Sequence, residues 1–142
     1  MRKAPDPSER AETDARFPSG PWTGFWLQRI YTGRQYMRDL WLHFVDGRVT
    51  GGGVDLVGEF TFNGSYQLDD GTVTLSKQYI SSHLVRYEGR NQDDGMWLWG
   101  VWTIGYDRGG FHIWPQGEED PTRRRLKEEL DVPLQVPAAI PV

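Results

Sequence analysis

The sequence predicts an all-β fold, an antiparallel up-and-down β-barrel of about eight strands with a short C-terminal helix. The 142 residues include 17 glycines, well above the ~7% usual in soluble proteins, and a heavy aromatic load of 7 Trp, 6 Tyr and 6 Phe. Strand-like runs alternate with turn residues at nearly regular spacing. No helix-length amphipathic pattern separates these runs, and parallel strands would need long crossovers. Sequential strands are therefore expected to pair antiparallel and to close into a barrel, which removes exposed edges.

The expected strands are delimited by turn signals. Asp46-Gly47 and Asn63-Gly64 suit type I′ hairpin turns, because both central positions of such turns have positive φ. The long run 48–62 contains Gly51-Gly52-Gly53 and Gly58. We interpret this run as one strand bent by glycines, with two separate strands as the alternative. The expected strands are 22–31, 36–45, 48–62, 65–68, 72–80, 83–88, 95–104 and 111–114, with turns at 69–71 and 107–110 and a polar loop at 89–94.

The two ends of the chain are expected to lie outside the barrel, which we place at residues 20–116. Residues 1–19 are rich in charge, Pro, Ser and Ala, a composition typical of a flexible leader. Residues 117–142 predict a short helix and a Pro-rich tail. Asp120 suits the helix cap and Pro121 its first turn.

Composition excludes several classes of function. The absence of cysteine rules out disulfides, thiolate metal sites and a cysteine nucleophile. The net charge of −4 argues against a nucleic-acid partner, which favours a basic face. No apolar run is long enough for a signal peptide or a membrane span, so we expect a cytoplasmic protein without a membrane partner. The three histidines stand far apart in sequence, and we expect neither a metal nor another cofactor.

The candidate ligand-binding residues come from the alternation of side chains along barrel strands. In the run 72–80, the face that carries two apolar residues also carries Lys77 and Tyr79. The same alternation points His83 and Tyr87 inward from the next run, and Trp102 from the run 95–104. Asp55, beside the glycine bend, is expected to join them. The predicted ligand-binding set is Lys77, Tyr79, His83, Tyr87, Trp102 and Asp55.

This set favours a non-catalytic barrel that binds a small, partly apolar and anionic molecule. Lys77 and His83 would hold the anionic group, and the aromatic rings would form the apolar walls. One alternative is a barrel-type cyclase or isomerase, with His83 or Asp55 as the base, Tyr79 or Tyr87 as a proton donor, and Lys77 as an electrostatic stabiliser. Another is a filled barrel that serves as a protein-interaction module. No motif predicts a catalytic residue.

The outer wall of the barrel carries a second candidate surface. Trp97, Trp99 and Val101 alternate with Leu98 and Trp102, so the run 95–104 is apolar on both faces. A solvent-facing wall should instead be polar on its outer face. We predict that Trp97, Trp99 and Val101 pack against a second copy in a homodimer. The alternative is that the C-terminal segment of the same chain covers them.

The start of the barrel resembles a known superfamily. Gly20-Pro21-Trp22, or alternatively Gly24-Phe25-Trp26, resembles the Gly-X-Trp that opens lipocalin-like (calycin) barrels, which include lipocalins, fatty-acid-binding proteins and avidins. The resemblance implies a closed barrel over residues 22–115, with Trp22 or Trp26 plugging its closed end, and small-molecule binding as a class. The chain is shorter than a typical lipocalin, lacks the disulfide common there, and does not match the biotin-contacting pattern of avidins. The resemblance therefore names no ligand.

Overall fold

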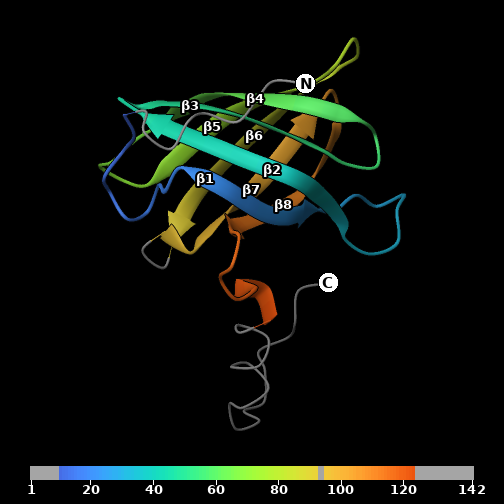
Figure 1. Cartoon of the computed structure of the whole chain (residues 1–142). Helices are drawn as coiled ribbons and strands as arrows, with labels where there is room; N and C mark the ends of the chain where they lie inside the picture. Colours follow the sequence, from blue (N-terminus) through green and yellow to red (C-terminus); the bar gives the residue numbers. More distant parts are fainter. Residues whose placement is uncertain (1–9, 93–94, 124–142) are drawn as a thin grey trace, which may run out of the picture.

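The computed structural model, which describes residues 10–92 and 95–123, is a closed barrel of eight antiparallel strands (Figure 1). Each strand pairs with its neighbours in sequence, and the last strand pairs with the first. The predicted fold class is therefore confirmed. The strands are β1 Gly20–Trp26, β2 Gln35–Val45, β3 Arg48–Val54, β4 Glu59–Tyr66, β5 Thr72–Tyr79, β6 Leu84–Gln92, β7 Trp97–Ile104 and β8 Asp107–Pro115.

The strand boundaries differ from the predicted ones between residues 48 and 68. The run 48–62 is not one bent strand but the two strands β3 and β4, as the alternative had it, joined by a turn at 55–58. The hairpin predicted at Asn63-Gly64 is wrong, because both residues lie inside β4 and pair with β3 and β5. Of the predicted short strand 65–68, Ser65 and Tyr66 form the end of β4, and residues 67–68 belong to the connection that follows. The predicted total of eight strands is still correct, because the run 48–62 contains one strand more than expected and the segment 65–68 does not form a separate strand.

Glycine at position 64 serves close packing rather than a turn. Its φ is not positive, and Gly64 pairs with Leu75 of β5. A Cβ at Gly64 would lie 1.9 Å from the carbonyl oxygen of Thr74, so only glycine fits at this position of β4. The reversal occurs instead at Asp55, whose carboxylate Oδ1 accepts a hydrogen bond from the Val57 amide at 2.9 Å, an Asx-type turn.

Two other predicted loops belong to strands. The expected polar loop at 89–94 is strand as far as Gln92, because β6 continues along β7 in register. The expected turn at 107–110 lies inside β8, and the chain reverses at Gly105 and Tyr106 instead. In both cases, polar and glycine residues occupy paired strand positions of the barrel wall.

The described part of the predicted leader, residues 10–19, packs against one end of the barrel. Phe17 is fully buried and its ring lies 4.8 Å from that of Tyr66 and 5.4 Å from that of Phe44. The Glu12 amide donates to the carbonyl oxygen of Phe44 at 2.7 Å. For these ten residues the expectation of a flexible leader is therefore corrected. A single buried aromatic side chain, in a polar segment, anchors them to the core.

This end of the barrel is the closed end. Trp22 packs on Phe44 with ring centroids 5.9 Å apart, and its indole Nε1 donates to the carbonyl oxygen of Pro18 at 2.9 Å. Trp22, of the two tryptophans that the resemblance offered, therefore has the plugging position. Trp26 lies at the other end of β1, where its indole contacts Asp55.

Beyond β8 the chain lies outside the barrel wall. The Asp120 carboxylate caps a helical turn at 121–123 by accepting from the Thr122 amide at 2.9 Å, and it pairs with Arg34 at 3.0 Å. The predicted cap is therefore present. The rest of the predicted helix and the Pro-rich tail, residues 124–142, lies outside the described residues.

The barrel interior is largely filled by side chains, and the alternation predicted for β5 is confirmed. Val73, Leu75, Lys77 and Tyr79 are all buried, while the residues between them are partly exposed. Large apolar side chains from the other strands meet them in one core cluster. Its members include Leu40, Leu42, Phe44, Phe60, Phe62, Tyr87, Leu98, Phe111 and Ile113.

On the outer wall, the three residues of the predicted dimer surface do not share one environment. Trp97 is only 5% exposed, because it stacks on His112 at 5.7 Å and its indole Nε1 donates to His112 Nδ1 at 3.1 Å. Trp99 and Val101 are 36% and 37% exposed. The exposed part of the patch is therefore narrower than the sequence pattern indicated.

Candidate functional site

A buried ion pair lies near one end of the barrel lumen. Lys77 comes from the inward face of β5, and Asp55 from the turn between β3 and β4. The Lys77 Nζ and Asp55 Oδ2 atoms are 2.6 Å apart, and both side chains are almost completely shielded from solvent. Charged side chains are rarely buried unless they are paired, so each of these residues accounts for the burial of the other.

Asp55 is held by three side-chain donors from the two strands β1 and β5, as well as by its own turn. Its Oδ2 accepts from Lys77, from the Tyr79 hydroxyl at 2.7 Å and from the Trp26 indole at 3.1 Å. Its Oδ1 accepts from the amide of Val57. One carboxylate thus builds the β3–β4 turn with one oxygen and neutralises the lysine with the other.

The surroundings of Lys77 suit a cation. Its ammonium lies 4.2 Å from the ring centroid of Phe60 and 4.9 Å from that of Tyr79, close enough for cation–π attraction. It also donates to the Tyr87 hydroxyl at 3.2 Å. Aromatic faces therefore replace part of the hydration that Lys77 loses on burial.

The pKa values follow from burial and pairing. Burial lowers the pKa of Lys77 to about 8, although the charge of Asp55 opposes this shift, so the ammonium stays protonated at neutral pH. Burial alone would raise the pKa of Asp55. The charge of Lys77 and the hydrogen bonds from Lys77, Tyr79 and Trp26 outweigh burial and hold that pKa below its ordinary value. Burial, above all, raises the pKa of Tyr79 and Tyr87, so both phenols keep their protons.

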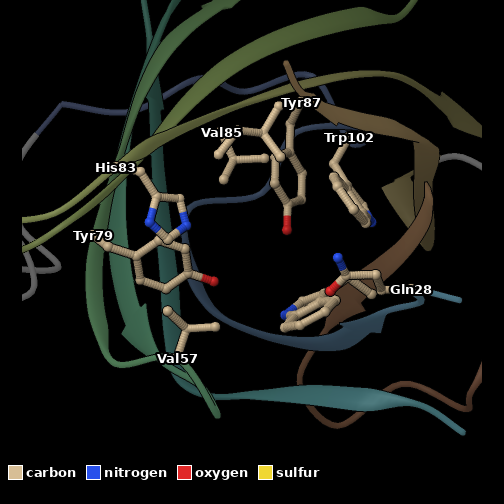
Figure 2. Close-up of a pocket in the computed structure, with 9 residues that line it drawn as sticks. Gln28, Val57, Tyr79, His83, Val85, Tyr87 and Trp102 are labelled. Atoms are coloured by element: carbon tan, nitrogen blue, oxygen red, sulfur yellow. The ribbon is translucent and has the colours of Figure 1, made fainter. Parts of the chain in front are cut away.

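A cavity of about 80 Å³ opens at this end of the barrel, next to the ion pair. Figure 2 shows the hydroxyls of Tyr79 and Tyr87 directed toward its centre, with Trp102 and Gln28 across the cavity from Tyr79. The lining is mainly aromatic and aliphatic. The lining residues are Trp26, Gln28, Val57, Tyr79, His83, Val85, Tyr87, Trp102 and Ile104.

The structure brings the six predicted ligand-binding residues together, in two layers. Lys77 and Asp55 lie beneath the cavity and do not line it. Tyr79 and Tyr87 belong to both layers, since each contacts the ion pair and faces the cavity. His83 and Trp102 line the cavity.

His83 and Trp102 differ in exposure. His83 is exposed at the rim, with its ring 5.0 Å from that of Tyr79, while Trp102 is buried and meets Trp26 edge-on at 6.2 Å. Ring contacts therefore join each of them to a neighbouring lining residue.

Sequence reasoning missed part of the lining. Gln28 and Val57 lie in loops, whereas the sequence pattern placed them in the expected strands 22–31 and 48–62, and only the closed barrel brings both loops to the cavity. Trp26 carried a usable signal, because it lies in the second Gly-X-Trp, but that pattern suggested a plug rather than a cavity wall. Val85 lies between His83 and Tyr87 on the face predicted to point inward, but it was not included among the predicted ligand contacts.

The geometry limits the chemistry of the site. The charge of Lys77 is already balanced by Asp55, so it does not serve as a free anchor for an anion. Asp55 accepts hydrogen bonds on both oxygens and has a lowered pKa, which makes it a poor general base. Among the described residues, no three His, Asp or Glu side chains are grouped closely enough to hold a metal ion.

Comparison with known proteins adds no further identification: no family model, no curated protein and no solved structure matches this chain. The closed, all-antiparallel, eight-stranded barrel is compatible with calycin architecture. What defines the class of this protein is thus its barrel fold alone.

Proposed function

We propose that the protein binds a small, partly apolar molecule in the cavity at the open end of the barrel, without catalysing its conversion. The observation that carries this proposal is the lining, in which aromatic and aliphatic walls surround the Tyr87 hydroxyl. Binding sites of this kind combine an apolar surface with a few fixed polar groups. The volume of about 80 Å³ is well below the roughly 300–1,000 Å³ of drug-sized sites, so the bound group is small.

The polar contact of this ligand is expected to come from Tyr87. Its oxygen accepts from Lys77, which leaves the hydroxyl proton available toward the cavity. The Tyr79 proton is already donated to Asp55, and the Trp102 indole donates to the carbonyl oxygen of Leu27. A neutral hydrogen-bond acceptor on a small ring or short chain fits this arrangement better than the anion predicted from Lys77.

The proposal is tested by ligand-observed NMR on the full chain, with phenol, benzamide and benzoate as probes. We expect saturation transfer to the two neutral probes and a weaker signal for benzoate. Val85→Phe should abolish the transfer, because the larger side chain enters the cavity. The matched control Thr103→Phe adds the same ring at an exposed position of the same barrel and should leave binding unchanged.

A second variant tests the polar contact. Tyr87→Phe should weaken binding of benzamide two- to tenfold, since a neutral hydrogen bond contributes about 0.5–1.5 kcal/mol. Thermal melts of each variant check that the barrel is folded. The proposal fails if none of the three probes shows transfer, or if Val85→Phe and Thr103→Phe behave alike.

A further inference from the structure

Among the residues that the structure describes, most of the exposed large apolar side chains lie at one end of the barrel. The loops 27–34, 55–58, 80–83 and 105–106 all lie at the end where the cavity opens, at the right in Figure 1. Ile30 is 77% exposed and Tyr106 is fully exposed. We call this set the mouth rim. It consists of Leu27, Ile30, Tyr31, Leu56, Val57, Ile80, Leu84 and Tyr106.

The two ends of the barrel also differ in charge. The four loops at the mouth carry Arg29 and Arg34; of the carboxylates at this end, Asp55 is buried in the pair with Lys77, and Asp107 at the start of β8 accepts a hydrogen bond from Gln28. Arg34 is paired with Asp120, whereas no ion pair joins Arg29 to any described residue. The loops at the opposite end have the reverse composition. The described loops 46–47 and 67–71 contain Asp46, Asp69 and Asp70 and no Lys or Arg; Asp46 is paired with Arg10 of the segment 10–19, which packs at the same end.

We propose that the mouth rim docks on the surface of an anionic lipid bilayer. Apolar side chains on loop tips can enter the headgroup region, where Tyr is also favoured. Arg29 beside them supplies attraction to anionic headgroups. The aspartate-rich loops at the far end would be repelled, so the charge distribution orients the barrel with its mouth toward the bilayer.

This proposal revises the expectation of no membrane partner. That expectation relied on the lack of a long apolar run, and no helix among the described residues is long and apolar enough to span a bilayer. Surface docking needs no such run. The mouth rim is assembled from four loops far apart in the sequence and from Leu84 at the start of β6, and only the closed barrel brings them to one end.

The test is co-sedimentation of the full chain with vesicles of phosphatidylcholine alone and of phosphatidylcholine with an equimolar amount of phosphatidylserine. We expect binding to the mixed vesicles that weakens as salt is raised, and weaker binding to pure phosphatidylcholine. Ile30→Asp and Leu56→Asp should each weaken binding to mixed vesicles at least tenfold. Both residues are exposed, so neither substitution should disturb the fold.

The matched control is Leu68→Asp, an exposed leucine in a loop at the opposite end, which should bind vesicles as the unmodified chain does. Arg29→Gln should weaken binding to the mixed vesicles and reduce its dependence on salt. The proposal is overturned if neither vesicle is bound or if Leu68→Asp weakens binding as much as Ile30→Asp. It is also overturned if Ile30→Asp changes only self-association, as measured by light scattering.

The proposal that the mouth rim docks on a bilayer and the proposal that the cavity binds a small molecule can be tested independently of each other. Val85→Phe fills the cavity from inside the barrel and leaves the loop residues of the mouth rim in place. We expect this variant to bind mixed vesicles normally while it loses the benzamide signal.

Discussion

Asp55 and Lys77 form a polar group inside an otherwise aromatic core, and each depends on the other. A buried ion pair is weak evidence for stability, because desolvation offsets much of the attraction between the charges. Removing one partner is a different matter, since the remaining charge is then buried without compensation. Asp55 has an additional structural role, because its Oδ1 atom holds the β3–β4 turn. Their contributions can be separated by substitutions that keep the turn.

We predict a strong coupling between these two residues. Asp55→Asn removes the charge but keeps an oxygen for the Val57 amide, and Lys77→Met removes the opposite charge. Each single variant should lose about 3–5 kcal/mol of the free energy of unfolding. The double variant should be more stable than either single one, because no uncompensated charge remains. Urea unfolding measures all four proteins, and losses that simply add would contradict the prediction.

The pH dependence of stability gives a second test of the same carboxylate. The folded-state pKa of Asp55 lies below its ordinary value of 3.8, so its contribution is complete above that value. It is lost as the pH falls through the folded-state pKa. We therefore expect the stability difference between the unmodified chain and Asp55→Asn to be largest near neutral pH. It should shrink progressively below about pH 4.

The comparison with Asp55→Asn isolates one group among several. Glu12, Asp14 and Asp120 also have lowered pKa values, but they are present in both proteins and cancel in the difference. Unfolding free energies from urea titrations at a series of pH values provide the measurement. A difference that stays constant down to pH 2 would contradict a lowered pKa of Asp55 in the folded protein.

At the scale of strands, alternation was the reliable signal and glycine the unreliable one. The inward faces of β5 and β6 were predicted correctly because a closed barrel fixes which side of each strand is buried. Glycine has two uses that look alike in a sequence. Gly47 has a φ of 78° and does form a turn, whereas Gly64 sits in an extended strand where a side chain would collide with β5.

We predict that Gly64→Ala destabilises the barrel by about 1–3 kcal/mol, the usual cost of overpacking. The added methyl would overlap the carbonyl oxygen of Thr74 across the β4–β5 pair. Asn63→Ser, at the exposed neighbouring position, should change stability by less than about 0.5 kcal/mol. Thermal or urea unfolding of both variants is sufficient. Equal losses at the two positions would instead fit a hairpin turn formed by both residues.

The candidate site was predictable where it is built from strands. Lys77, Tyr79 and Tyr87 follow from alternation alone, and Asp55 was placed near them from its position beside the glycines. The pairing of Lys77 with Asp55 was not predicted, because the turn at 55–58 only exists once 48–62 is divided into two strands. That pairing changes the expected chemistry, since it removes the free cation on which the anionic ligand depended.

For the whole molecule, the main asymmetry is between the two ends of the barrel. Residues 10–19 close one end through Phe17, while the other end keeps a cavity and the exposed mouth rim. Neither end of the barrel has a local sequence signal. The closed end depends on a single aromatic residue in a polar segment, and the mouth rim depends on loops far apart in the sequence. Both appear only when the strands close into a barrel.

The homodimer stays a prediction, and its expected contact surface is reduced to Trp99 and Val101, because Trp97 is buried. Trp99 and Val101 face outward beside Arg90 and Glu88 of β6, their register partners on that strand. A two-fold axis at Trp99 would stack the two apolar patches and allow Arg90 of each copy to face an acidic side chain of the other. We expect light scattering at micromolar concentration to give twice the mass of one chain.

Trp99→Glu should convert the dimer to a folded monomer, because it introduces a charge at the centre of the contact. Leu68→Glu, an exposed leucine at the closed end, is the matched control and should remain dimeric. A monomeric mass for the unmodified chain would rule the dimer out. If Trp99→Glu then also lowered the melting temperature, the C-terminal segment of the same chain would be the cover of this wall, since the substitution would break a contact made within one molecule.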